Sequence, residues 1–205
     1  MKSNYSNETR YLNLEYKGPR DYAHGSDIFN VVNRELKAIA DPKGWIKSIV
    51  FRKFATNDCY LQLSPESKPP PEKLAATLIV QLSDSTLEAV VVESERPITR
   101  HYEFDEEKIL SICLIDQSSI KQKQRSGFSE IEEVIAMTKG LHSKLFPLQS
   151  GKWVFSELHL LQDFSSNSLS YCVELKQSLG GRMTVSEIIE DGVKIGQIKF
   201  IVAHI

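Results

Sequence analysis

The sequence predicts an α+β protein made of two tandem units, each with one long helix and several antiparallel strands. Two segments, one ending near residue 40 and one over residues 127–145, place apolar residues at the three- and four-residue spacing of a helix that packs on a sheet. Most of the remaining chain alternates apolar and polar residues, which is typical of half-buried strands. The same order of elements occurs twice, which indicates two copies of one unit.

The first unit is organised around its helix. Ser26 or Asp27 can accept hydrogen bonds from the unpaired amides at the helix start, and Asp41-Pro42-Lys43-Gly44 ends the helix after Ala40. A first strand over residues 11–16 precedes the helix and stops at Gly18-Pro19. The strands predicted after the helix cover residues 45–54, 59–63, 74–82 and 87–92, with a proline-rich loop over 64–72 and a polar linker over 93–107.

The second unit repeats this order from Lys108 onwards. A strand over residues 109–115 is followed by a polar connection over 116–125 and by the second helix. The Glu190-Asp191-Gly192 turn predicts a hairpin between the last two strands. The strands predicted after this helix cover residues 153–164, 171–175, 183–189 and 193–203.

Landmark residues recur at matching places in the two halves. We therefore expect one unit over residues 8–100 and a second over residues 108–205, joined in one body. Each tryptophan follows a helix and opens an apolar strand, so we expect both rings to be largely buried. The matched landmarks are Trp45 with Trp153, Gly25 with Gly127, Phe54 with Phe164, and Thr77–Asp84 with Thr184–Asp191.

The charge balance excludes several classes of partner. The chain carries 25 Lys and Arg residues against 27 Asp and Glu residues, a formal net charge of −2, which favours neither nucleic acid nor an anionic membrane. No run approaches the roughly 20 apolar residues of a membrane span, and the segment MKSNYSNETR lacks the apolar core of a signal peptide. We therefore expect a cytoplasmic protein without a nucleic-acid or membrane partner.

The cysteines and histidines do not indicate a metal site. Cys59, Cys113 and Cys172 lie far apart in predicted strands, and neither they nor the histidines have the short paired spacing of zinc ligands. We expect reduced, buried thiols, no metal and no cofactor.

One helix followed by an antiparallel meander buries its apolar stripe most simply when the sheet curves around the helix. This element order resembles the hotdog fold, and its duplication over residues 8–205 resembles the double-hotdog proteins of the acyl-thioester dehydratase and thioesterase superfamily. The resemblance implies processing of acyl thioesters of coenzyme A or of an acyl carrier protein, by a hydroxyacyl dehydratase or a thioesterase. It leaves a homodimer open.

The resemblance also implies where the reaction would occur. Enzymes of this fold direct backbone amides from a helix start at the thioester carbonyl, where they stabilise negative charge together with the helix dipole. The matching backbone positions are Gly25, Ser26, Gly127 and Phe128.

Dehydratases of the fold set a histidine before one helix against a carboxylate on the other helix. His24 would be this histidine, and Glu130 or Glu133 the carboxylate. Asp27 could instead serve as the base that activates water in a thioesterase. The basic residues before the two helices, which could bind the phosphates of coenzyme A or phosphopantetheine, include Arg20, Lys123 and Arg125.

The sequence departs from the family motifs in two ways. Gly25-Ser26-Asp27 follows His24 where the bacterial fatty-acid dehydratases have a His-Phe-Pro type motif, and the Asp-containing strand motif of the commonest thioesterases is absent. Two alternatives to an enzyme therefore stay open: a non-catalytic protein that binds an acyl chain or an acyl carrier, and a structural or interaction protein of another mixed α/β fold. In these cases His24 is a loop histidine bonded to a backbone carbonyl, and Asp27 is a helix-capping or first-turn acid.

Overall fold

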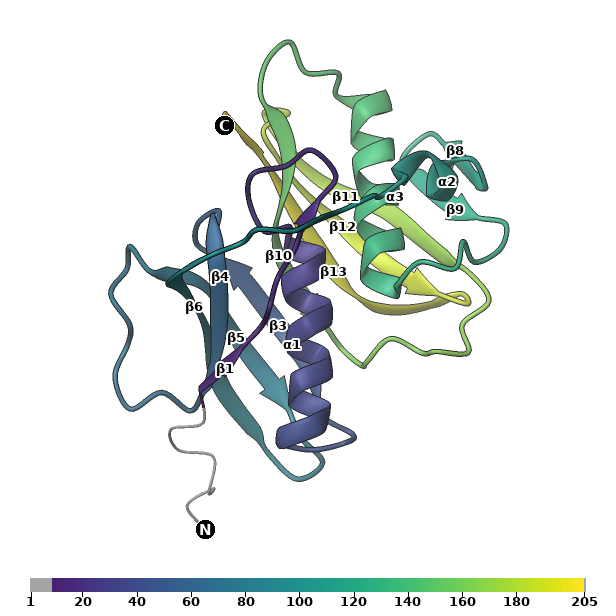
Figure 1. Cartoon of the computed structure of the whole chain (residues 1–205). Coiled ribbons are helices and arrows are strands. Elements are labelled where there is room, and N and C mark those ends of the chain that lie inside the picture. The colour runs from purple at the N-terminus through teal and green to yellow at the C-terminus, as the bar shows by residue number, and fades with distance from the viewer. Residues whose placement is uncertain (1–8, 205) are drawn as a thin grey trace. The chain divides into compact units, whose positions relative to one another are not determined.

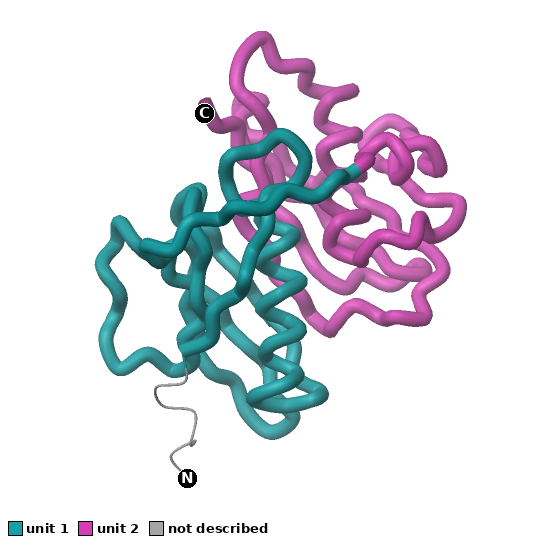
Figure 2. The backbone as a smooth tube through the Cα atoms, in the orientation of Figure 1, with its two compact units in different colours: residues 1–104 teal, residues 105–205 magenta. Residues whose placement is uncertain are grey.

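The computed structural model describes residues 9–204. Its chain divides into two compact units, Met1–Phe104 and Asp105–Ile205 (Figure 2). Each unit contains one long helix that lies against an antiparallel sheet (Figure 1), so the predicted α+β class is confirmed. No helix in the described range is both long and apolar enough to cross a membrane.

The first unit has a five-stranded antiparallel sheet in the order β1-β4-β6-β5-β3. A second, two-stranded sheet pairs β2 with β7 in parallel. Helix α1 packs on the large sheet next to β3. The elements are β1 (Thr9–Tyr11), β2 (Tyr16–Lys17), α1 (Gly25–Ile39), β3 (Trp45–Phe51), β4 (Asn57–Leu63), β5 (Leu74–Gln81), β6 (Thr86–Pro97) and β7 (His101–Tyr102).

Helix α1 forms where the apolar stripe predicts it. His24 is the N-cap, with extended backbone angles, and Asp27 in the first turn favours the positive end of the helix dipole. The stripe is buried against the sheet, and it includes Ile28, Phe29, Val32 and Leu36. Burial of these four side chains stabilises the unit by roughly 1.5–3 kcal/mol each.

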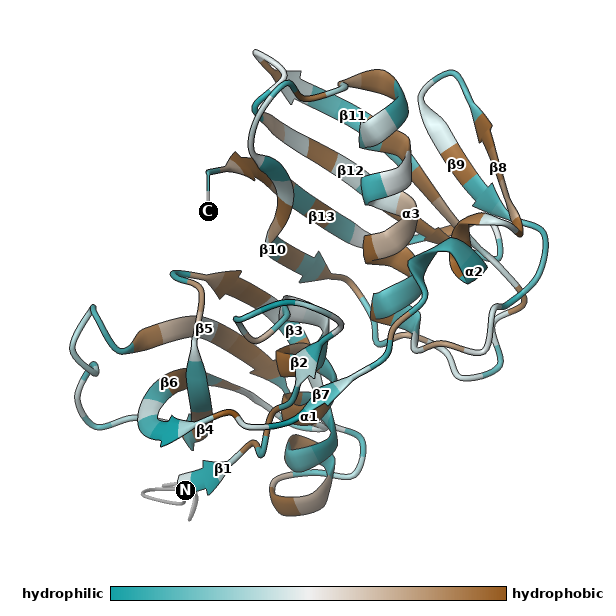
Figure 3. Cartoon of the chain, turned by 45° about the horizontal axis from the view of Figure 1, so that its top comes forward, coloured by the Kyte–Doolittle hydropathy of each residue, from teal (hydrophilic) through white to brown (hydrophobic). Residues whose placement is uncertain are grey.

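The second unit has a six-stranded antiparallel sheet in the order β10-β13-β12-β11-β9-β8. Helix α3 packs on this sheet, and the short helix α2 packs on α3. Hydrophobic and hydrophilic residues alternate along β13 in Figure 3, because successive side chains of a strand point to opposite faces of the sheet. The elements are α2 (Glu106–Leu110), β8 (Cys113–Asp116), β9 (Ser119–Gln122), α3 (Glu130–Leu145), β10 (Lys152–Leu160), β11 (Tyr171–Leu179), β12 (Met183–Glu190) and β13 (Val193–Ala203).

The two units share the order of their elements but not the pairing of their strands. In the first unit the last strand of the large sheet, β6, lies between β4 and β5, whereas in the second unit the last strand, β13, lies between β12 and β10. Because β4 and β5 both run antiparallel to β6, they are parallel to each other. Residues 64–73, with their four prolines, therefore form a crossover and not a hairpin.

Several predicted boundaries are wrong. The expected strand over residues 11–16 is two short strands, because Asn13 adopts a left-handed backbone (φ 53°) between them. The expected linker over 93–107 is largely ordered, since β6 continues to Pro97 and β7 follows. The expected strand over 109–115 starts as helix α2, which Asp105 caps by accepting from the Glu107 amide.

Two further expectations need correction in the second unit. The connection over residues 116–125 contains strand β9, and α3 begins at Glu130 instead of Gly127, which lies outside the helix with a φ of +86°. Ser129 caps α3 through a capping box with Glu132. Trp153 is buried as expected, and Trp45, in the first unit, is partly buried.

Candidate functional site

A polar cluster surrounds the first turn of α1. His24 Nδ1 accepts a hydrogen bond from the Ser26 amide (3.3 Å) and lies 2.8 Å from Ser26 Oγ. This is an N-cap made by an imidazole, and it fixes the ring against the helix start. The His24 side chain is half-buried, while Ser26 is fully buried.

Lys17 and Tyr102 complete this cluster from the small parallel sheet. The Lys17 ammonium donates to Ser26 Oγ (2.7 Å) and lies 2.9 Å from Asp27 Oδ1, and the Tyr102 hydroxyl donates to the same carboxylate oxygen (2.8 Å). The ammonium also lies 4.0 Å from the centre of the Phe104 ring. The exposed fraction of Lys17 is 0%, so this cation is removed from solvent and compensated by Asp27 and by aromatic faces.

Burial dominates the electrostatics of Asp27. It raises the pKa of this carboxyl above its ordinary value, although Lys17, Tyr102 and Ser26 favour the charged form. Oδ1 receives the bonds of this cluster, and Oδ2 is buried without a hydrogen-bond partner among the described residues. Asp27 is therefore held as an ion-pair partner of Lys17 at the start of α1.

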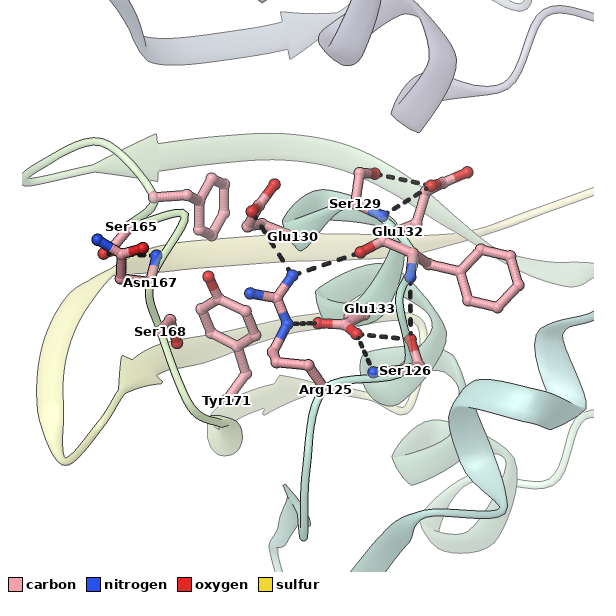
Figure 4. A network of polar contacts seen from close by, with 12 residues as sticks. Arg125, Ser126, Ser129, Glu130, Glu132, Glu133, Ser165, Asn167, Ser168 and Tyr171 are labelled. Atoms are coloured by element: carbon pink, nitrogen blue, oxygen red, sulfur yellow. Dashed lines mark hydrogen bonds and ion pairs between the residues drawn. The ribbon is translucent and has the colours of Figure 1, made fainter.

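A second polar cluster surrounds the first turn of α3 (Figure 4). Glu133 is 0% exposed, and both of its carboxylate oxygens are bonded. Arg125 Nε donates to Oε2 (2.5 Å), while the amide and the hydroxyl of Ser126 both donate to Oε1 (2.7 and 2.5 Å). These charge-assisted bonds tie the loop before α3 to the helix.

Arg125 connects this carboxylate with the rest of the second cluster. Its guanidinium lies 3.5 Å from Glu130 and 5.0 Å from the ring of Tyr171. The buried Tyr171 hydroxyl donates to Glu190 Oε1 (2.8 Å), and Figure 4 shows the Arg125 side chain between Tyr171 and Glu133. Burial together with Glu190 raises the pKa of Tyr171 well above its ordinary value, so the phenol stays neutral.

The structure places the predicted backbone donors in different local settings. Gly25 is the first residue of α1, but the Ser26 amide is engaged by His24. Gly127 and Phe128 lie in the loop before α3, where the Phe128 carbonyl accepts from Arg125 (3.3 Å). The matched glycines therefore do not occupy equivalent positions relative to their helices.

The three basic residues expected to bind phosphate also differ. Arg20 donates to the Lys17 carbonyl (2.8 Å) and Arg125 is engaged by two glutamates, whereas Lys123 is exposed. His24 belongs to the first unit and Glu130 and Glu133 to the second, so their pairing across the units stays a prediction. In the described part of the chain, no group of three or more His, Cys, Asp or Glu side chains is arranged to hold a metal ion.

Sequence reasoning missed Lys17, Tyr102, Ser126, Tyr171 and Glu190. The residues around Lys17 do not indicate that it is buried, because its burial depends on the pairing of β2 with a strand more than eighty residues later. Ser126 carried a usable signal, since a serine ahead of an acidic helix start is typical of capping and loop-anchoring bonds.

Comparisons with known proteins give fold-level similarity at low identity. No family model and no curated protein sequence matches the chain. One similar solved structure is the dehydratase domain of PpsC from Mycobacterium tuberculosis in complex with C12:1-CoA, with 10% identity, 89% of this chain and 85% of that chain covered, and a TM-score of 0.42. A second is the dehydratase domain of MlnD from Bacillus amyloliquefaciens, with 10% identity, 95% of this chain and 89% of that chain covered, and a TM-score of 0.44. A third is a protein from Thermobifida fusca YX described as a putative thioesterase II, with 10% identity, 90% of this chain and 88% of that chain covered, and a TM-score of 0.45. They belong to the classes that the sequence resemblance named, and at these TM-scores they assign no activity to this chain.

Proposed function

We propose that the chain is a double-hotdog protein, with units over residues 8–100 and 108–205, that processes acyl thioesters of coenzyme A or of an acyl carrier protein. His24 is the side chain that acts on the thioester. Two features support the proposal: each unit sets one long helix against an antiparallel sheet, and each helix begins in a polar cluster. A helix start offers aligned amides and a positive dipole end to a thioester oxygen on which negative charge develops.

The observation that carries the proposal is the position of His24. The ring is fixed at the N-cap of α1 through Nδ1 and yet is only half-buried, whereas the Asp27 and Glu133 carboxylates are buried. A catalytic acid or base needs both a fixed orientation and access to its substrate. His24 combines the two.

A second candidate function is a silent protein that binds an acyl chain or an acyl carrier. The burial of Asp27 and Glu133, two of the three candidate acids, favours it. Both carboxylate oxygens of Glu133 accept from Arg125 or Ser126, and Asp27 is paired with Lys17, so neither carboxylate is arranged to exchange a proton with a ligand. In this case the helix starts bind the thioester without a chemical step.

A panel of thioesters separates these functions. The protein is incubated with saturated, 2-enoyl and 3-hydroxyacyl thioesters of coenzyme A and of phosphopantetheine, while thiol release and enoyl absorbance are followed together. Thiol release without enoyl change indicates a thioesterase, and enoyl change without thiol release indicates a dehydratase. Binding of a non-hydrolysable acyl-CoA thioether without either change indicates the silent binder, and no binding of any ligand overturns the proposal.

His24→Gln is the matched variant for an active protein. It should lower turnover roughly 10²–10⁴-fold, as removal of a general acid or base does. His159→Gln is the control, because His159 is exposed on β10 in the other unit. Equal turnover of the wild type and His24→Gln would remove His24 from the reaction.

A further inference from the structure

The small parallel sheet of the first unit positions the buried Lys17 ammonium at the start of α1. Tyr16 pairs with His101 and Lys17 with Tyr102, and backbone bonds from Tyr16 to Arg100 and from Gly18 to Tyr102 (both 2.8 Å) close this sheet on either side. The register sets the Lys17 and Tyr102 side chains next to each other, and both reach Asp27 Oδ1. Burial of an ion pair costs desolvation free energy. Lys17 also contacts Ser26, and Ser26 in turn contacts His24.

The contact between Lys17 and His24 runs through one hydroxyl group. Ser26 Oγ accepts from Lys17 Nζ (2.7 Å), because an ammonium can only donate. The single proton of this hydroxyl then has two acceptors, His24 Nδ1 at 2.8 Å and Asp27 Oδ1 at 3.1 Å. The nearer acceptor is the imidazole, and the cation on the oxygen makes the hydroxyl a stronger donor.

Two proton arrangements fit these contacts, and the surroundings favour one of them. If Nδ1 carried the proton, this proton would face the Ser26 amide hydrogen, whose nitrogen lies 3.3 Å away, and would add positive charge beside the Lys17 ammonium. If Nε2 carries the proton, Nδ1 accepts from both the amide and the hydroxyl of Ser26. The second arrangement gives the amide and the hydroxyl of Ser26 an acceptor, so these contacts favour a ring protonated at Nε2.

We propose that Lys17 is a positioning residue that acts through Ser26 to hold His24 in the Nε2–H tautomer, so that the ring donates a hydrogen bond to the carbonyl oxygen of the thioester. This inference rests on the proposed function. A ring protonated at Nε2 polarises a carbonyl but cannot at the same time abstract a proton through that nitrogen. The geometry therefore favours carbonyl activation over removal of a proton from the acyl chain as the role of His24.

The tautomer can be measured without a substrate. Long-range proton–nitrogen correlation spectra distinguish protonated from unprotonated ring nitrogens, and the chain contains only five histidines. The His24 signals are identified by their loss in His24→Gln. The wild type should show Nδ1 unprotonated and Nε2 protonated at neutral pH. A wild-type ring protonated mainly at Nδ1 overturns the inference.

Two variants test the connection through Ser26. Ser26→Ala removes the hydroxyl and keeps the Lys17–Asp27 pair, and Lys17→Met with Asp27→Asn removes both charges together, so that neither is left buried alone. Each should raise the population of the Nδ1–H tautomer about 5-fold, which corresponds to the loss of one hydrogen bond. Lys53→Met, which removes a different lysine paired to the buried Glu93, is the control and should leave the His24 tautomer unchanged.

The outcomes separate this inference from the proposed function. An unchanged tautomer ratio in Ser26→Ala and in the double variant, with both proteins folded, overturns the role of Lys17 whatever the thioester panel shows. If the double variant does not fold, Ser26→Ala alone decides. In an active protein the tautomer change should lower turnover by up to about 5-fold, the size of the shift in the tautomer equilibrium, with little change in KM because the binding surface is unaltered. A shifted tautomer with unchanged turnover overturns the donor role of His24.

Discussion

His142 should make the second unit sensitive to mild acid. The ring lies in the last turns of α3, is 0% exposed, and packs against Trp153 (4.5 Å between ring centres) and Phe200 (5.3 Å). Its Nε2 meets the Thr184 hydroxyl at 3.0 Å. The carboxyl end of a helix favours a charged histidine, but here burial dominates and lowers the pKa of His142 to about 4.

The sign and size of the effect follow from linkage. Because the folded state holds His142 neutral while the unfolded chain takes up a proton near its ordinary pKa, about 6.5, the stabilisation is complete above that pH and is lost as the pH falls towards 4. The full loss is about 3 kcal/mol, at 1.36 kcal/mol for each pKa unit. Between pH 7 and pH 5 the free energy of unfolding should fall by about 2 kcal/mol.

Urea unfolding monitored by tryptophan fluorescence measures this loss. Trp45→Phe leaves Trp153 as the only tryptophan, so the signal comes from the unit that contains His142. Most carboxyls titrate below pH 5 and leave this window to the histidines. His142→Gln should abolish the loss, whereas the exposed His159→Gln should keep it. Equal midpoints at pH 7 and pH 5 in the Trp45→Phe protein would refute the buried, neutral imidazole.

Two further predictions concern stability. Arg125→Met leaves the fully buried Glu133 carboxylate without its cation and should lower the free energy of unfolding in urea by about 3–5 kcal/mol. Adding Glu133→Gln should restore most of the lost stability. A loss under about 1 kcal/mol in the single variant would contradict the ion pair. Gly196→Ala sets a methyl group 2.5 Å from the His159 carbonyl oxygen and should cost about 1–3 kcal/mol. Gly140→Ala should cost less, because its methyl group clashes only with the flexible end of Leu110. Equal melting temperatures of the two variants would speak against the close strand packing.

Local patterns predict much of this fold. The apolar stripe from Ile28 to Leu36 marks α1 because four-residue spacing leaves one buried face, and alternation marks most strands of both sheets. The Asp191-Gly192 turn is also recognisable, since both residues have positive φ angles and hairpins of this type select such residues. Helix class, strand class and tight turns depend on neighbouring residues, so the sequence displays them directly.

Strand order and the site could not be derived in the same way. Residues 64–73 cross over, so β4 pairs with β6 and not with β5, whereas the matching strands β11 and β12 form a hairpin. The two units therefore have different strand neighbours, although their elements follow one order. His24 is singled out by its place before the helix, but the contacts of its Nδ1 with the amide and the hydroxyl of Ser26 were not foreseen. Lys17 is followed by a glycine and has no local signal of burial. Its side chain is buried because β2 pairs with β7 at Tyr102.

The pairing of β2 with β7 affects the order in which the first unit folds. The segments that it joins are far apart in the chain, as the bond between the His101 ring and the Gly18 carbonyl, across 83 residues, illustrates. Such a contact closes a loop of nearly the whole unit, and the entropy of closure makes contacts of this kind slow to form. On the ribosome α1 can form early, but Lys17 and Asp27 acquire Tyr102 only after the unit's final residues have left the exit tunnel. The site of the first unit is therefore completed last, as the second unit begins to be synthesised.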